Sequence, residues 1–209
     1  MEEELSIEVP AGPRLEGRLG LVEHPRGGLV VCHPHPLYGG DMDNPVVVRA
    51  ADVAREAGLS TLRFNFRGVG GSGGSHGQGD AERDDVRAAL LSLADRLPPG
   101  HPLGLAGYSF GAWVSSRVAA SLAGVAALGL IAPPLSLLGF PPLAGLRASV
   151  LLIVGSRDPY CSTGDVHRLA ESHPKAETVI VEGADHFFFG KLFPLGEAVR
   201  GWVGRWAPA

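Results

Sequence analysis

The chain of 209 residues predicts an α/β fold: a mostly parallel twisted sheet of about seven to eight strands with helices on both faces. Short apolar runs typical of strands alternate with segments of helical period along the whole chain. The later runs are continuously apolar, as expected of strands whose two faces are both covered. The length fits a single domain over residues 1–209 that can bury a proper core.

Eight candidate strands, taken in chain order, support the prediction of a sheet. The first two, 5–9 and 15–22, alternate polar and apolar residues and indicate an antiparallel pair at one edge. The later runs are apolar and are predicted as inner strands, namely 29–32, 61–65, 103–106, 125–131, 150–154 and 178–181.

Four helices are predicted between and after these strands. Residues 42–57 and 111–123 supply two of them. A third follows a candidate N-cap at Asp80, and its apolar stripe is Val86, Leu90, Leu93 and Leu97. The C-terminal helix shows a similar stripe, which is Leu192, Leu195, Val199, Trp202 and Trp206. We interpret the tryptophans as core packing rather than as a substrate platform.

Charge and hydropathy exclude several classes of function. The net charge is −4, the pI is near 6.0, and the arginines form no basic run, which argues against a nucleic-acid partner. The acidic start of the chain lacks the positive flank and apolar run of a signal peptide. The longest apolar stretch, 125–140, is interrupted by Pro133 and Pro134 and is too short to span a membrane. The sequence therefore predicts a cytoplasmic protein without a membrane partner, and it carries no signature of an oligomeric state.

The two cysteines and the paired histidines indicate no metal centre. Cys32 lies in a strand-like run and is expected to be buried, whereas Cys161 lies in a loop and is expected to be exposed. His33 and His35 could supply metal ligands, but no third or fourth ligand is suggested nearby. We interpret both imidazoles as braces of their loop, and we predict neither a metal nor a cofactor.

The segment Gly107-Tyr108-Ser109-Phe110-Gly111 carries the chemistry. It has the G-x-S-x-G pattern between a strand and a helix, which is the context of a nucleophile elbow. Glycines on either side of such a serine let the strand and the helix approach closely. Two further matches, at 70–74 and 73–77, lie in a Gly/Ser-rich run without a strand or a helix, and we interpret that run as a loop. Ser109 is therefore the candidate nucleophile.

A serine hydroxyl needs a base, and the base needs an acid to orient it. His186 follows the last predicted strand, and Asp158 follows the strand before it. Both are expected at the carboxyl edge of the sheet, where catalytic groups of open α/β sheets gather. Asp185 and Asp165 are the weaker alternatives for the acid. The chain order serine, aspartate, histidine favours Ser109, Asp158 and His186 as the catalytic set.

Backbone amides are predicted to hold the oxyanion that forms during acyl transfer. One donor is the N–H of Phe110, directly after the nucleophile. The other is expected from the loop after strand 29–32, where Pro34 and Pro36 have no N–H to donate. His35 is the first choice for the second donor and Leu37 the alternative.

These motifs in combination resemble the α/β-hydrolase superfamily, and specifically the small bacterial serine hydrolases related to dienelactone hydrolases. The residues that carry the resemblance are 33–36 with Gly39, Gly40 and Asn44, 63–70 with Ser72, 107–111, Asp158, and 183–188. The resemblance covers nearly the whole chain and implies an α/β-hydrolase fold with carboxylic-ester hydrolase activity. Dienelactone hydrolases proper carry a cysteine nucleophile, so Ser109 departs from them. Many relatives insert a helical cap after the sixth strand. Here only residues 132–149 separate two strands, so a minimal or absent cap is expected.

The sequence thus predicts a serine hydrolase that cleaves small carboxylic esters through an acyl-enzyme intermediate. Candidates to line an apolar pocket are Leu37, Tyr38, Tyr108, Tyr160, Phe187 and Phe188. One alternative is a peptidase or acyltransferase that uses the same three residues. Another is a non-catalytic hydrolase-fold protein that binds a small ligand. Such a protein would be expected to have a damaged catalytic triad, whereas all three positions are intact here. The physiological substrate and the acyl chain length stay open.

Overall fold

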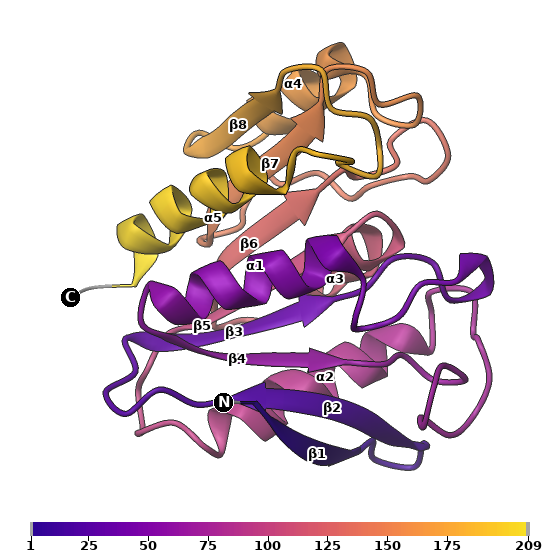
Figure 1. Ribbon diagram of the computed structural model, residues 1–209, viewed down its shortest axis with the longest axis vertical. Helices are drawn as coiled ribbons and strands as arrows, with labels where there is room; N and C mark the ends of the chain where they lie inside the picture. Colours follow the sequence, from indigo (N-terminus) through magenta and orange to yellow (C-terminus); the bar gives the residue numbers. More distant parts are fainter. Residues whose placement is uncertain (1, 208–209) are drawn as a thin grey trace.

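The computed structural model describes residues 2–207 and places all eight expected strands in one sheet (Figure 1). The strand order is β1-β2-β4-β3-β5-β6-β7-β8. At one edge, β1 (Glu3–Glu8) pairs antiparallel with β2 (Arg14–Gly20), which in turn pairs antiparallel with β4. The remaining strands run parallel, and they are β3 (Gly27–Cys32), β4 (Leu59–Phe64), β5 (Leu103–Tyr108), β6 (Val125–Ile131), β7 (Ser149–Gly155) and β8 (Ala176–Val181). The prediction of a mostly parallel sheet with an antiparallel edge is confirmed.

Helices cover both faces of this sheet. In Figure 1, α1 (Pro45–Glu56) and α5 (Leu192–Trp206) lie side by side in front of the sheet. The opposite face is covered by α2 (Glu82–Ala94), α3 (Phe110–Ser121) and α4 (Thr163–Glu171). Among residues 2–207, no helix is long and apolar enough to cross a membrane.

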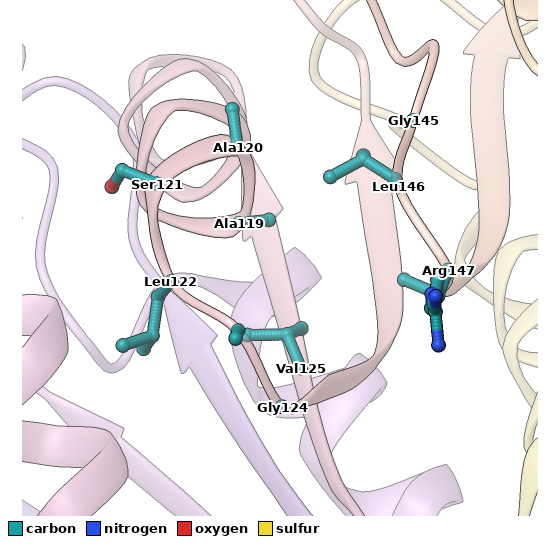
Figure 2. A pocket seen from close by; sticks show the side chains of 11 residues that line it. Ala119, Ala120, Ser121, Leu122, Gly124, Val125, Gly145, Leu146 and Arg147 are labelled. Atoms are coloured by element: carbon teal, nitrogen blue, oxygen red, sulfur yellow. The ribbon is translucent and has the colours of Figure 1, made fainter.

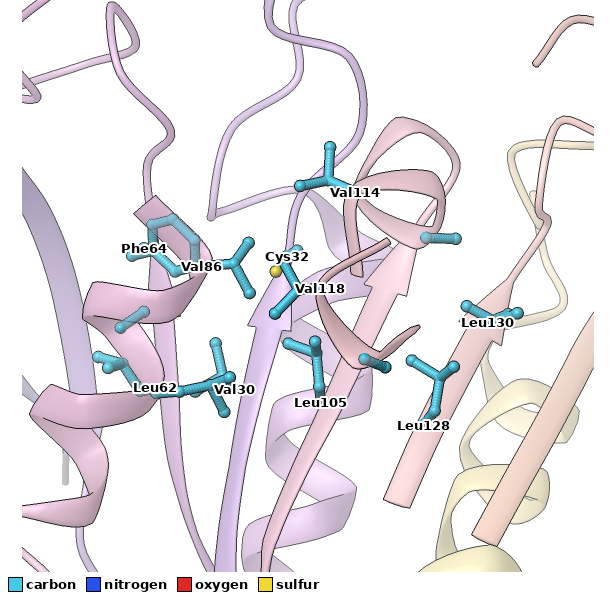
Figure 3. Packing of buried hydrophobic residues seen from close by; sticks show 14 of the residues in the cluster. Val30, Cys32, Leu62, Phe64, Val86, Leu105, Val114, Val118, Leu128 and Leu130 are labelled. Atoms are coloured by element: carbon cyan, nitrogen blue, oxygen red, sulfur yellow. The ribbon is translucent and has the colours of Figure 1, made fainter. Parts of the chain in front are cut away.

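The position of β3 in the middle of the sheet explains why its sequence has no polar residue. Val30 and Cys32 point to the core beneath α2 and α3, as Figure 3 shows. Leu29 and Val31 point to the core beneath α1 and α5. Successive side chains of a strand face opposite sides, so a strand covered on both sides must be apolar throughout. Cys32 is buried, as expected from the sequence.

The start of α2 differs from the prediction. Asp80 does not cap this helix, which begins at Glu82 behind Ala81 without a side-chain cap. Instead, the Asp80 carboxylate accepts a 2.7 Å hydrogen bond from Arg117 on α3 and lies 3.4 Å from Arg83. The ion pair with the neighbouring helix therefore holds the carboxylate away from the amides of its own helix.

The prediction that Cys161 is exposed is wrong. Only 1% of its surface is accessible, because the residue precedes α4 and packs with Val166 into the core beneath α2 and α3. Burial raises the pKa of its thiol to about 12. The helix α4 itself was not predicted from the sequence. It is short, and Val166 is its one fully buried residue within the described chain.

The six parallel strands all end at one edge of the sheet, and the segments after four of them hold the candidate catalytic residues and oxyanion donors. β3, β5, β7 and β8 all end there, and the chain segments after them begin with His33, Ser109, Ser156 and Glu182. In a parallel sheet all strands present their carboxyl ends at the same edge. The loops that hold the candidate site residues are therefore neighbours in space.

Candidate active site

Ser109 occupies a sharp turn between β5 and α3. Its backbone has φ 55° and ψ −116°, a conformation that non-glycine residues rarely adopt. A Cβ on Gly107 would lie 2.2 Å from the Gly111 carbonyl oxygen. A Cβ on Gly111 would lie 2.5 Å from the carbonyl oxygens of Cys32 and His33. Both glycines are therefore required for the strand, the turn and the helix to pack at this distance.

His186 reaches Ser109 from the loop after β8. Its Nε2 lies 3.0 Å from Ser109 Oγ, and the ring is nearly buried at 6% exposure. The hydroxyl of Tyr108 donates a 2.9 Å hydrogen bond to the His186 carbonyl oxygen. Burial raises the pKa of Tyr108, so its hydroxyl keeps the proton that it donates. Tyr108 therefore anchors the histidine loop to the end of β5.

Asp158 orients His186 from the loop after β7. Its Oδ2 lies 2.8 Å from His186 Nδ1, while its Oδ1 accepts a 2.8 Å hydrogen bond from the Tyr160 amide. The carboxylate has no solvent-exposed surface. A carboxylate at Nδ1 fixes the proton on that nitrogen and leaves Nε2 free to accept from the serine hydroxyl.

The two alternative acids lie in other contacts. Asp185 Oδ1 accepts hydrogen bonds from the amides of Phe187 at 3.0 Å and Phe189 at 3.4 Å, so it braces the histidine loop. Asp165 lies in the first turn of α4, where its Oδ2 accepts a 2.5 Å hydrogen bond from the Ser162 hydroxyl. Of the three aspartates that the sequence left open, the structure brings only Asp158 to His186.

The predicted oxyanion donors border the same cavity as Ser109. Phe110 is the first residue of α3, and His35 follows β3 across the site. Among residues 2–207, neither amide has a protein hydrogen-bond acceptor. The amide of Leu37 instead donates to His35 Nδ1 at 3.2 Å. This occupied amide makes Leu37 a poor alternative donor.

A cavity of about 510 Å³ opens above Ser109 and His186. Four of the predicted lining residues border it, namely Tyr38, Tyr108, Tyr160 and Phe187. Two do not: Leu37 is 70% exposed on the short 3-10 turn Pro36–Tyr38, and Phe188 lies in the core beneath α1 and α5. Another wall, which was not predicted from the sequence, is formed by Pro134, Leu137 and Leu138.

That missed wall belongs to the segment between β6 and β7. The segment contains no helix, so no cap covers the cavity from this position. Its apolar residues contact the site because the chain turns at Pro133 and Pro134 just beyond the end of β6. The leucines that follow Pro133 and Pro134 between two predicted strands were the sequence pattern that could have identified this wall.

A second hollow, of about 350 Å³, lies at the opposite edge of the sheet (Figure 2). It is bordered by the end of α3, the start of β6 and the segment before β7. Its serine, Ser121, donates to main-chain carbonyl oxygens of α3. The residues that border the hollow include no histidine and no carboxylate that could activate this hydroxyl as a nucleophile. Among the described residues, no group of three or more histidines, cysteines or acidic residues could hold a metal ion.

Comparisons with known proteins show the family to which this fold belongs. Residues 29–191 match a family model described as an alpha/beta hydrolase domain. The structure is similar to an α/β serine hydrolase without lid from Xanthomonas campestris, with 36% identity and a TM-score of 0.88 over 100% of this chain and 96% of that one. An alpha-beta serine hydrolase homologue from Coxiella burnetii is also 36% identical, with a TM-score of 0.86 over 95% and 96% of the two chains. An uncharacterised protein of Rickettsia prowazekii is 34% identical over 200 residues, which cover 91% of this chain and 84% of that protein.

Proposed function

The chain belongs to the α/β-hydrolase family, and from this premise we propose that it is a serine hydrolase that cleaves small carboxylic esters through an acyl-enzyme intermediate. One observation carries the proposal. Asp158, His186 and Ser109 form an unbroken line of hydrogen-bond contacts, of 2.8 Å and 3.0 Å, at the base of an apolar cavity. In this arrangement His186 can take the proton from the Ser109 hydroxyl as the oxygen attacks a carbonyl carbon.

The reaction would proceed in two half-reactions. Ser109 Oγ attacks the ester carbonyl while its proton moves to His186 Nε2, and the imidazolium that forms is stabilised by Asp158. The tetrahedral intermediate collapses, the C–O bond to the alcohol breaks, and His186 returns the proton to the leaving alcohol. Water then attacks the acyl-serine with His186 again as base, which releases the acid and restores Ser109. None of these reaction steps requires a cofactor.

The amides of His35 and Phe110 are proposed to stabilise the negative oxygen of the tetrahedral intermediate. Both border the cavity that holds Ser109, and neither has a protein acceptor among the described residues. Donors that are fixed before the reaction cost no reorganisation when the charge develops. A single donor of this kind typically contributes ~10²–10³ in turnover.

The cavity supports a small neutral substrate. Its ionisable lining groups, within the described chain, are His35, His186 and three tyrosines, so no lysine, arginine or carboxylate lines it. The site is open to solvent because no cap covers it. A panel of esters, amides and thioesters would distinguish an esterase from a peptidase or an acyltransferase.

Ser109→Ala tests the proposal directly. The variant should lose turnover of p-nitrophenyl acetate by at least ~10³-fold, because the attacking oxygen is removed. Ser75→Ala is the matched control, since Ser75 lies in the G-x-S-x-G-like loop and is exposed. It should retain wild-type turnover. Retained activity in Ser109→Ala, or loss in Ser75→Ala alone, would overturn the assignment.

A further inference from the structure

The loop after β3 contains a side chain that acts on the oxyanion site without bordering the cavity. We propose that His33 is a positioning residue: its imidazole locks the Pro34–His35 peptide plane so that the His35 N–H is aimed at the reacting oxygen. The inference rests on the proposed function, because it assigns a cause to the placement of one oxyanion donor. His33 is fully buried, so it cannot contact substrate itself.

Two hydrogen bonds determine which nitrogen of His33 carries the proton. The Phe66 amide donates a 2.9 Å hydrogen bond to His33 Nε2, so this nitrogen must be unprotonated. The proton of the neutral ring is then on Nδ1, which lies 2.6 Å from the Pro34 carbonyl oxygen. His33 therefore donates to Pro34 and accepts from Phe66, and it bridges the loop after β3 to the loop after β4.

Burial keeps the imidazole in this neutral form. It lowers the pKa of His33 to about 4, so the ring carries no charge near neutral pH. If Nε2 also carried a proton, it would meet the Phe66 N–H as a second donor, and this hydrogen bond would be lost. The rings of Phe66 and His33 also pack edge to face, with centroids 4.7 Å apart. Charge, tautomer and orientation are thus all fixed by contacts outside the cavity.

The lock acts through the planarity of the peptide bond. The Pro34 carbonyl and the His35 N–H belong to one trans peptide group, so the two bonds point in opposite directions. When His33 holds the Pro34 carbonyl toward the protein interior, the His35 N–H must point the opposite way, toward the cavity. His35 borders this cavity together with Ser109 and Phe110.

The next peptide of the loop is fixed independently. The His35 carbonyl oxygen accepts hydrogen bonds from the amides of Tyr38 and Gly40, both at 3.1 Å. Gly40 also packs directly against the Pro34 carbonyl, since a Cβ there would lie 2.2 Å from that oxygen. The carbonyl oxygens on both sides of the His35 N–H, those of Pro34 and His35, are thus bound within the protein.

The second donor, the Phe110 amide, is held by backbone packing that does not involve the His33 imidazole. Gly111, one residue after Phe110, packs directly on the carbonyl oxygens of Cys32 and His33. The backbone that bears His33 therefore contacts the start of α3. Loss of the His33 lock should change the direction of the His35 amide while the Phe110 amide stays in place.

His33→Phe is the test, because it keeps a planar ring and removes both hydrogen bonds. We expect kcat for p-nitrophenyl acetate to fall ~10- to 100-fold, less than the full loss of one oxyanion donor. KM should change less than about threefold. A trifluoromethyl ketone transition-state analogue should bind more weakly by the same factor as kcat. Active-site titration corrects each rate for the fraction of folded enzyme.

His173→Phe is the matched control. His173 is also a buried histidine that bridges two backbone groups, the Leu146 carbonyl and the Lys175 amide, but it lies before β8 at the far edge of the sheet. This variant should lose stability without a loss of kcat or of analogue affinity. Equal kinetic losses in both variants would assign His33 a merely structural role and overturn the inference.

A spectroscopic measurement on the wild-type enzyme does not depend on the variant folding. Nitrogen-15 NMR should show His33 with a protonated Nδ1 and a bare Nε2, unchanged from pH 8 to about pH 5. The opposite tautomer would overturn the inference. If the wild type hydrolyses p-nitrophenyl acetate through Ser109 but His33→Phe keeps kcat and analogue affinity, only the positioning role fails. If Ser109→Ala is active, the proposed function itself fails.

Discussion

Replacing Asp158 by Asn should remove most of the activity without removing the side chain. The Tyr160 amide donates to Asp158 Oδ1, so an asparagine must place its carbonyl oxygen there and turn its NH₂ toward His186. That NH₂ donates to Nδ1, which forces the imidazole proton onto Nε2, facing the Ser109 hydroxyl. In this tautomer His186 cannot accept the serine proton.

The expected loss follows from this change of tautomer. A wrong tautomer in an otherwise intact set costs ~10⁴ in kcat, which corresponds to about 5 kcal/mol of transition-state stabilisation. The assay is steady-state hydrolysis of p-nitrophenyl acetate at pH 7–8, with the thermal midpoint as the check on folding. The near-isosteric change should leave the midpoint within a few degrees of the wild type.

Asp185→Asn is the matched control for Asp158→Asn. Asp185 uses a single oxygen to accept from the Phe187 and Phe189 amides, and an asparagine carbonyl can do the same. We expect kcat to change less than about threefold. If Asp158→Asn kept more than a tenth of the wild-type kcat, or if Asp185→Asn lost as much as Asp158→Asn, the assignment of the acid would be refuted.

Three further predictions concern packing, thiol chemistry and pH. Gly111→Ala should destabilise the fold by about 1–3 kcal/mol in urea and lower kcat at least tenfold, because the new Cβ would lie 2.5 Å from two backbone oxygens. Gly139→Ala, whose Cβ would meet no atom within 4 Å, should do neither, and similar losses in both would contradict the packing argument. Both cysteines are buried and the pKa of each thiol is raised to about 12 by burial, so Ellman's reagent at pH 8 should react with Cys32 and Cys161 only as fast as the protein unfolds. Rapid native-state labelling would argue against this burial. Burial lowers the pKa of His33 from 6.5 to about 4, so its contribution to stability is complete above pH 6.5 and decreases as the pH falls toward 4. The wild type should lose about 2.5 kcal/mol more than His33→Phe between pH 7 and pH 4.5, measured by urea unfolding, and equal losses would contradict this linkage.

The sharp turn at Ser109 and the residues that meet it could be predicted from the sequence because their sequence patterns are local. Gly107 and Gly111 flank Ser109 within one pentapeptide, and the strand before it and the helix after it are readable by composition. Asp158 and His186 follow strands of their own, and parallel strands all end at one edge of the sheet. The topology then brings these distant residues together.

Other features depend on contacts between segments that are distant in sequence. Asp80 has the composition of an N-cap, but Arg117 on another helix pairs with its carboxylate. Cys161 lies in a loop by pattern and is buried because it joins a core cluster built from distant segments of the chain. Leu137 borders the cavity because the chain turns after β6, which no local periodicity encodes. Likewise, the tautomer of His33 is set by an amide of another loop.

Covalent labelling by a fluorophosphonate probe tests the central claim most directly. Intact-mass measurement followed by peptide mapping should show one adduct per chain, located on Ser109, with labelling abolished in Ser109→Ala. Adducts on Ser72 or Ser75, or no adduct on a folded and ester-hydrolysing protein, would contradict the account.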